Sequence, residues 1–409
     1  MATGYFIGKA ASVAQVTKIV YSSIVATDTY SVTINGKTVS YVALSTSLGD
    51  LIDALVSAWN SSAEPEHQEM VAARREDPTL SGLQLTGRGG VPSTVSAGAT
   101  TGTATVTTPT AASGPNFWNV AANWLGSVLP SAADTVIVTN SAVDILYGLT
   151  DTTNYAILII EASYQGAIGL PETNSNGYPE YRTRRLTLGT GSAINVQIGY
   201  GTGNHASRLY LDLQGSNATM TVCGSNANTF SGYPIQIIGT ASGSTANVYG
   251  GSVQFDSSST SIVTTLNIIE EAGAQTRPDV RLTDKVTSVT VTCIGGSLLL
   301  EGSTTTLIAR DSAKVSVAKA AAAANVTVSN RAQVDWETSG GITTKLIVQP
   351  LGIANFGNVG TAKTVAACDA YSGADIRDPN AKVTWTTGVV LIGCRIADVD
   401  IDLGLGFTI

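Results

Sequence analysis

The sequence predicts a mainly β protein, in which a small N-terminal α+β domain is followed by a parallel β-helix with turns of about 19 residues. Three observations predict this fold. Only 13% of the 409 residues are charged and few are strong helix formers, which argues against a mostly helical protein. Residues 1–92 contain a hairpin signal followed by a helix signal. The downstream half repeats short strands at a nearly fixed period.

The N-terminal domain, expected over residues 1–92, is predicted from local signals. Residues 13–25 form an apolar-rich strand, and the alternating runs 30–35 and 37–43 meet at Asn35-Gly36, a strong hairpin signal. Ser47 and Asp50 match a capping box, and apolar residues at helical spacing follow as far as Trp59. Residues 70–74 fit a short helix or a strand, and 83–86 fit a strand.

These segments also carry a resemblance. The runs YSVTINGKTVSY, SGLQLTG and GVPSTVS, with the helix between the first two, resemble a small domain that recurs in virion proteins of tailed phages. The resemblance covers residues 10–98. It implies assembly into a particle rather than catalysis.

Two segments follow this domain. Residues 93–115 contain no charge and consist mostly of Ser, Thr, Ala, Gly and Val, so we expect a linker or an extended arm. Residues 116–138 (NFWNVAANWLGSVLPSAADTVIV) resemble the first segment of bacterial and phage β-solenoid proteins. Trp118 and Trp124 would then cap the open end of a stacked core. The solenoid is expected over residues 116–409.

The internal repeat consists of two interleaved series of strands. One series begins at Val289 and the other at Leu298, and their members are spaced by 17 to 21 residues. Strands broken by Gly, Asn, Ser and Asp indicate turns made by loops, which is typical of a parallel β-helix. A period near 18 would suit a left-handed coil, but the hexapeptide pattern of such coils is absent, so we expect a right-handed one. The starting residues are Val289, Leu307, Val326, Leu346, Val365 and Val383 in the first series, and Leu298, Val315, Val334, Ile353 and Ala374 in the second.

Alternation within the strands predicts which side chains point outward. In the first series Val289 is expected to point inward, whereas Ile308 and Ile347 are expected outward, two turns apart. Large aliphatic residues repeated on an outer face suggest an interface, and we expect them to be buried in a homotrimer. In the second series the residues expected to face outward are Leu299, Ser316, Asp335, Ala354 and Asp375.

The sequence predicts no catalytic, cofactor-binding or metal site. Signature motifs for nucleophilic hydrolases and phosphate-binding loops are absent, and neither His67 nor His205 has a second ligand at metal spacing. Asp398, Asp400 and Asp402 alternate and could hold a cation, although a solvated face explains them more simply. Asp335 and Asp375 could approach the separation of an inverting glycosidase pair. With few aromatic residues around them, we expect no catalysis there.

Residues 177–186 (GYPEYRTRRL) form the one basic and aromatic cluster of an acidic chain. The cluster fits a solvated loop or a docking contact to an acidic neighbour, because Tyr and Arg are frequent interface anchors. Its candidate interface residues are Tyr178, Tyr181, Arg182, Arg184 and Arg185.

Composition limits the partners. The formal net charge of −8 argues against nucleic-acid binding, and no apolar run is long enough for membrane insertion. Residues 1–10 lack the pattern of a secretory signal. Since the four cysteines show no paired spacing, we expect free thiols and synthesis in a reducing cytoplasm.

These observations favour a non-enzymatic structural protein of a phage-like virion, assembled in the host cytoplasm alongside capsid or tail proteins. Decoration of the capsid surface is the preferred role. The alternative is a tail, fibre or tailspike protein that binds or degrades a host surface polysaccharide. A third hypothesis is a bacterial surface adhesin, but the lack of a secretory signal pattern in residues 1–10 argues against it.

Overall fold

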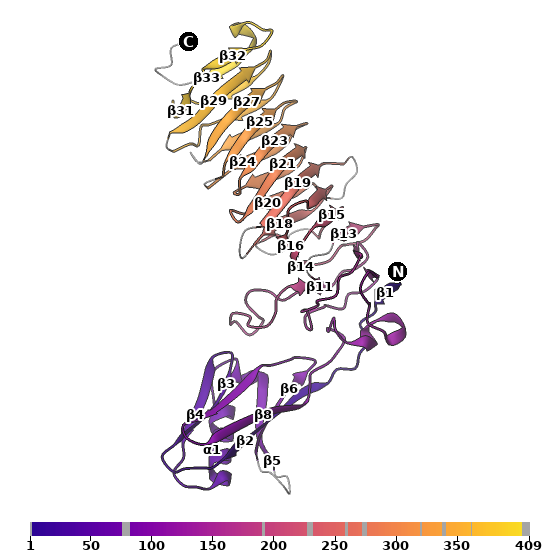
Figure 1. The fold of residues 1–409 in the computed structure, drawn as a ribbon, viewed down its shortest axis with the longest axis vertical. Coiled ribbons are helices and arrows are strands. Elements are labelled where there is room, and N and C mark those ends of the chain that lie inside the picture. The colour runs from indigo at the N-terminus through magenta and orange to yellow at the C-terminus, as the bar shows by residue number, and fades with distance from the viewer. Residues whose placement is uncertain are drawn as a thin grey trace.

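The computed structural model describes residues 2–75, 82–189, 193–226, 232–257, 261–271, 276–319, 321–337, 341–360 and 362–402. The molecule is elongated, with an antiparallel N-terminal domain at one end and a parallel β-solenoid extending from it (Figure 1). The mainly β fold and its order of parts are as predicted. None of the helices among the described residues is long and apolar enough to cross a membrane.

The N-terminal domain packs two antiparallel sheets around α1 (Leu48–Asn60), the single α-helix of the described residues. One sheet has the order β5-β6-β2-β8 and the other β4-β3-β7. The predicted hairpin is confirmed: β3 pairs with β4, and Asn35 and Gly36 both have positive φ angles. Ser47 accepts a hydrogen bond from the Asp50 amide at the helix start. The strands are β2 (Ala14–Ser22), β3 (Thr29–Ile34), β4 (Lys37–Val42), β5 (Met70–Arg75), β6 (Gly82–Gly89), β7 (Val95–Ala99) and β8 (Thr103–Thr110).

The linker predicted over residues 93–115 is wrong for most of its length. This segment contains β7, which pairs with β3, and β8, which pairs with β2. A segment of alternating Thr, Ala and Val can form a β-strand or an extended, unpaired arm. Which of the two forms depends on whether a distant strand is available for pairing, and the local sequence does not show this. The chain therefore leaves the domain near Ser113, whose backbone bonds to that of Val13.

The solenoid consists of two long parallel sheets. In both, each strand pairs with the equivalent strand one turn later, and apolar side chains from the two sheets fill the interior. Sheet A contains β1 (Thr3–Phe6), β9 (Thr135–Val138), β10 (Ile157–Glu161), β13 (Ile194–Tyr200), β15 (Ala218–Val222), β17 (Thr245–Val248), β19 (Ser261–Ile269), β21 (Val286–Ile294), β23 (Thr304–Arg310), β25 (Ala323–Val328), β27 (Ile342–Val348), β29 (Lys363–Ala370), β31 (Val383–Trp385) and β32 (Val389–Leu391). Sheet B contains β11 (Ala167–Ile168), β12 (Leu186–Thr187), β14 (Arg208–Ser216), β16 (Ile235–Thr240), β18 (Ser252–Asp256), β20 (Asp279–Leu282), β22 (Ser297–Leu300), β24 (Lys314–Val317), β26 (Gln333–Trp336), β28 (Ile353–Asn355), β30 (Asp375–Arg377) and β33 (Asp400–Asp402).

The coil has about 11 turns of about 22 residues each, so the predicted period of about 19 is too short for the whole solenoid. The shorter period holds locally: Leu307 pairs with Val326, and Val326 with Leu346. Earlier turns are longer, because loops such as the one between β11 and β12 extend from the coil.

Two facing assignments within the repeat are wrong. Val289 is exposed rather than buried, because the alternation of β21 breaks there and Val291, not Val289, pairs with Leu307. Ala354 is fully buried rather than outward, because it pairs with the inward Val334. A shift of one residue reverses the face of every side chain in a strand, so short strands are easily misassigned.

The first strand of the chain belongs to the solenoid, which corrects the predicted domain boundary of 1–92. β1 pairs in parallel with β9, from Thr3 with Thr135 to Phe6 with Val138. The antiparallel domain is therefore inserted between β1 and the rest of the solenoid (Figure 1).

Candidate functional site

The N-terminal domain contacts the solenoid through the loop between β11 and β12. This loop contains the basic and aromatic cluster 177–186, and it folds back on itself through a bridge between Thr173 and Pro179. The fold brings the cluster against Glu69, the last residue of the short 3-10 helix η1 (His67–Glu69). We call this region the joint.

Glu69 is the centre of the joint. Its carboxylate accepts hydrogen bonds from the hydroxyls of Tyr178 and Tyr181 and forms an ion pair with Arg182. The side chains of Glu69 and Arg182 are only 7% and 10% exposed. The two tyrosine rings are stacked, with centroids 6.3 Å apart, and the Arg182 guanidinium lies 4.4 Å from the centroid of the Tyr181 ring. Three residues of the cluster thus contact an acidic residue of their own chain, whereas the sequence predicts a solvated loop or a contact to an acidic neighbour.

Further bonds hold Arg182 in place. Its guanidinium pairs with Glu180 at 3.0 Å and donates to the carbonyl oxygen of Pro92 at 2.7 Å. Burial alone would lower the pKa of Arg182, but the surrounding negative groups, Glu69 and Glu180 among them, outweigh it and raise the pKa. The pKa of Tyr178 is also raised, first by burial and then by the neighbouring carboxylate of Glu69. The guanidinium therefore stays charged and the phenol stays a hydrogen-bond donor at neutral pH.

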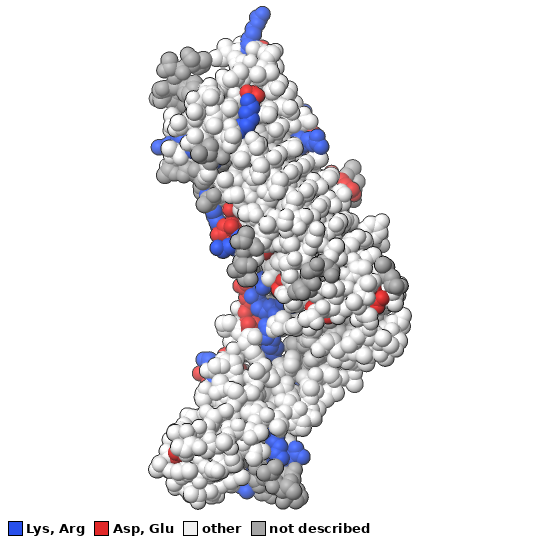
Figure 2. All heavy atoms as spheres, viewed as in Figure 1, with Lys and Arg blue, Asp and Glu red and all other residues white. Residues whose placement is uncertain are grey.

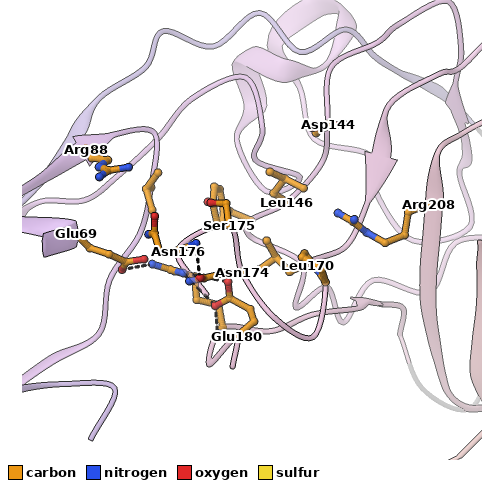
Figure 3. Close-up of a pocket in the computed structure, with 14 residues that line it drawn as sticks. Glu69, Arg88, Asp144, Leu146, Leu170, Asn174, Ser175, Asn176, Glu180 and Arg208 are labelled. Atoms are coloured by element: carbon orange, nitrogen blue, oxygen red, sulfur yellow. Dashed lines mark hydrogen bonds and ion pairs between the residues drawn. The ribbon is translucent and has the colours of Figure 1, made fainter. Parts of the chain in front are cut away.

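A cavity of about 250 Å³ lies beside these contacts (Figure 3). Glu69 and Arg88 lie on the side of the domain, whereas Asp144, Leu146 and Arg208 lie on the side of the solenoid. The tip of the β11–β12 loop lines the same cavity. A second hollow, of about 420 Å³, shares Leu146, Tyr147 and Arg182 with the first.

The remaining arginines of the cluster turn away from Glu69. Arg184 forms an ion pair with Glu172 at 3.1 Å, and Arg185 donates to Gln236 at 3.4 Å. The Arg185 and Arg208 guanidinium carbons lie 6.0 Å and 5.7 Å from the centroid of the Tyr210 ring. Arg182 thus contacts the N-terminal domain, whereas Arg184 and Arg185 contact the solenoid and its loop.

The outer face of sheet A is largely uncharged. Ile308 and Ile347 are half-buried and outward, separated by Thr327 as expected. On the next strand Ile347 pairs with Asp369, which forms an ion pair with Lys345. From β15 to β25 the two outward positions carry only Thr, Asn or Ile, and one of these columns runs through Thr219, Thr245, Thr265, Thr290 and Thr306.

The outer face of sheet B is charged by contrast. Glu301 pairs with Arg281 and Lys319 at 3.0 Å each, and Asp375 pairs with Arg377. In Figure 2 the visible charged side chains gather mainly along one edge and near the joint, beside a broad uncharged surface.

Asp335 and Asp375 do not form a facing pair. Asp335 stacks in register with Asn355, whereas Asp375 stacks with Ile353 in the adjacent column. Asp335 accepts hydrogen bonds from Gln333 and Asn355, and Asp375 is bound by Arg377. No group of three or more potential metal-ligating side chains occurs within the described residues.

Trp118 and Trp124 lie where the predicted cap would be. Both are buried against the first turns of the solenoid, and their rings meet edge to face with centroids 4.8 Å apart. Phe6 of β1 packs on both of them. The Trp118 indole donates to Asp151, and the Trp124 indole donates to the Trp118 carbonyl oxygen.

Four residues of the site could not be recognised from the sequence: Glu69, Arg88, Tyr147 and Arg208. Each lies in an ordinary local context, and only tertiary packing brings them together. Glu69 and Arg182 are both buried, and a buried charge needs a partner of opposite charge. The sequence alone does not show which residue that partner is. Comparison of the chain with protein families, with curated proteins and with solved structures finds no match.

Proposed function

We propose that this chain is a non-enzymatic structural component of a phage-like virion, in which the N-terminal domain attaches to the particle and the solenoid projects as a rod. The observation that carries this proposal is the joint. A buried ion pair with two tyrosine hydroxyls on the same carboxylate fixes the domain to the rod. Such a connection suits a protein that holds a rod at a set angle.

Decoration of the capsid surface is the preferred position, with capsid proteins as partners and a homotrimer as the assembled form. The uncharged outer face of sheet A supports self-association, because copies that meet there bring no like charges together. Sheet B, with its ion pairs and its Asp-rich end, is better suited to remain in water.

The experiment is electron microscopy of particles released by cells that express this sequence. Antibody fragments raised against the purified chain should label the capsid surface. Label confined to tails would instead support a tail or fibre component, and particles without any label would contradict the proposal.

The second candidate is a tailspike that binds or degrades host polysaccharide. One column on the outer face of sheet B favours it, because Tyr210, Gln236, Gln254 and Arg281 stack in register and could bond sugar hydroxyls. Incubation of the protein with host capsule or lipopolysaccharide distinguishes the two. The structural proposal expects no oligosaccharide release, whereas release abolished by Asp335→Asn would support the enzyme.

A further inference from the structure

Three arginines and three carboxylates line the cavity at the joint, and two of the arginines form no ion pair with any described residue. Its acidic residues are already engaged: Glu69 and Glu180 bind Arg182, and Asp144 accepts a hydrogen bond from the Ala167 amide. Arg88 makes no ion pair or hydrogen bond to any described residue, and it is exposed at the cavity wall. Arg88 and Arg208 are therefore the two lining cations that form no ion pair within the described part of the chain and that an added anion could bind.

Arg208 makes the stronger case. Its guanidinium is half-buried and donates two hydrogen bonds, at 3.2 and 2.7 Å, to one carbonyl oxygen, that of Gly169. Among the described residues no carboxylate lies within ion-pair distance of it. Burial lowers the pKa of Arg208 despite the charge of Asp144 nearby, so its cationic form is incompletely compensated. An anion placed here would gain a charge-assisted hydrogen bond in a partly water-excluded site.

The rest of the lining is polar but uncharged. Ser175 and Asn176, from the tip of the β11–β12 loop, make no side-chain hydrogen bonds to described residues, and neither does the Tyr147 hydroxyl. Leu146 and Leu170 provide an apolar wall, as Figure 3 shows. Hydroxyl and amide groups both donate and accept, which suits a ligand that carries several hydroxyls.

We propose that this cavity binds a small polyhydroxy carboxylate, such as a sugar acid or an open-chain hydroxy acid. Its carboxylate pairs with Arg208, and its hydroxyls bond to Tyr147, Ser175 and Asn176. Arg88 attracts the anion from the domain side. The site is formed by both the domain and the solenoid, so a bound ligand also bridges the joint. This inference does not depend on the structural role proposed above.

The experiment is saturation-transfer NMR on the full chain with four probes: D-glucuronate, tartrate, D-glucose and inorganic phosphate. Glucuronate or tartrate should bind with a dissociation constant near the millimolar range, and glucose about tenfold more weakly. If tartrate binds and glucuronate does not, the natural ligand is an open-chain hydroxy acid. If glucuronate binds and tartrate does not, the ligand is a sugar acid. Glucose binding as tightly as both acids would overturn the role of the carboxylate. Phosphate binding as tightly as both would overturn the role of the hydroxyls.

Variants complete the test. Arg208→Gln should weaken binding of the acid about tenfold. Arg208 also contacts Tyr210, so its replacement could alter the local structure as well as the binding. Asn176→Trp is therefore a second variant. Asn176 is exposed, and a tryptophan there should narrow the cavity and abolish binding without altering a buried group. Arg310→Gln, at an exposed arginine of β23, is the matched control and should bind as the wild type does. Failure of both acids to bind at tens of millimolar, or equal binding by all three variants, overturns the proposal.

Discussion

Arg182 of the solenoid and Glu69 of the N-terminal domain form an ion pair in which both side chains are almost fully buried. The residues are 113 positions apart in the sequence. Two tyrosine hydroxyls bond to the same carboxylate, so the pair is part of a hydrogen-bonded network rather than an isolated contact.

Arg182→Gln should weaken the attachment of the domain to the solenoid by about 3 kcal/mol, because it leaves a buried carboxylate without its cation. Small-angle X-ray scattering should show a wider range of domain orientations, and denaturant unfolding should show a separate transition for the domain. Lys37→Gln is the control, since Lys37 and Glu64 form an exposed pair that should contribute nothing measurable. A variant with unchanged scattering would show that other contacts fix the joint.

Phe6→Ala should destabilise the first turn of the solenoid by about 3 to 5 kcal/mol, because Phe6 is 1% exposed and packs on Trp118 and Trp124. Tryptophan fluorescence during denaturant unfolding includes the signals of Trp118 and Trp124 in this turn, together with those of the three tryptophans elsewhere in the chain. Tyr5→Ala is the matched control on the same strand. Tyr5 is 37% exposed and points outward, so its loss should cost less than about 1 kcal/mol. Equal effects of the two changes would contradict the buried position of β1.

The double change Ile308→Asp and Ile347→Asp should loosen a homotrimer, because it replaces two apolar side chains on the outer face of sheet A by charges. That face is uncharged from β15 to β25, and the ion pair of Lys345 with Asp369 lies beside Ile347. Light scattering should find the wild type near three times 41.9 kDa and the variant smaller. Leu299→Asp, an apolar-to-acidic change on the outer face of sheet B, should leave the assembly intact. If the wild type is monomeric at micromolar concentration and the double variant is unchanged, this face is simply exposed.

Lys363 should make stability depend on pH. Its side chain is fully buried, and burial lowers its pKa to about 8. The pKa of a lysine in an unfolded chain is about 10.4, so between pH 8 and pH 10.4 the unfolded state binds more protons, and this group makes stability rise with pH. The full change is on the order of 3 kcal/mol, and below pH 8 the stabilisation is absent.

The measurement is the free energy of unfolding of the wild type and of Lys363→Met at pH 7 and pH 10. Buried thiols act in the opposite direction above pH 9, since burial raises the pKa of Cys293 and of Cys368 to about 12. They are present in both proteins, so the difference between the two isolates the lysine. A constant difference across this range would show that Lys363 titrates normally.

Features of the fold that depend on neighbours in the sequence were predictable. The hairpin at Asn35-Gly36, the helix that begins after Ser47 and the repeated strands all follow from local turn chemistry or periodicity. The pairing of β1 with β9 was not predictable, because nothing near Thr3 specifies a partner at Thr135. The strand pairing of residues 95–110 was missed for the same reason.

The candidate site shows a similar division. The cluster 177–186 was recognisable by its composition, but its acidic partner, Glu69, lies in another domain. Asp335 and Asp375 were assigned to one column because Ile353 was taken as equivalent to Val334, and Ala374 as equivalent to Ile353. In the structure Val334 pairs with Ala354 and Ile353 pairs with Asp375, so each step was shifted by one residue. The three-residue strand β28 leaves that register weakly determined by sequence, since Ile and Ala are both apolar.

The insertion of the domain between β1 and β9 also affects biosynthesis. A ribosome adds about 5 to 20 residues per second, so β1 waits on the order of ten seconds before β9 is synthesised. During that time Phe6 has none of the aromatic partners that later bury it, whereas the antiparallel domain can already fold. The end of the solenoid nearest the domain is therefore completed only after the domain, and a chaperone that shields an exposed apolar strand would act at Thr3–Phe6.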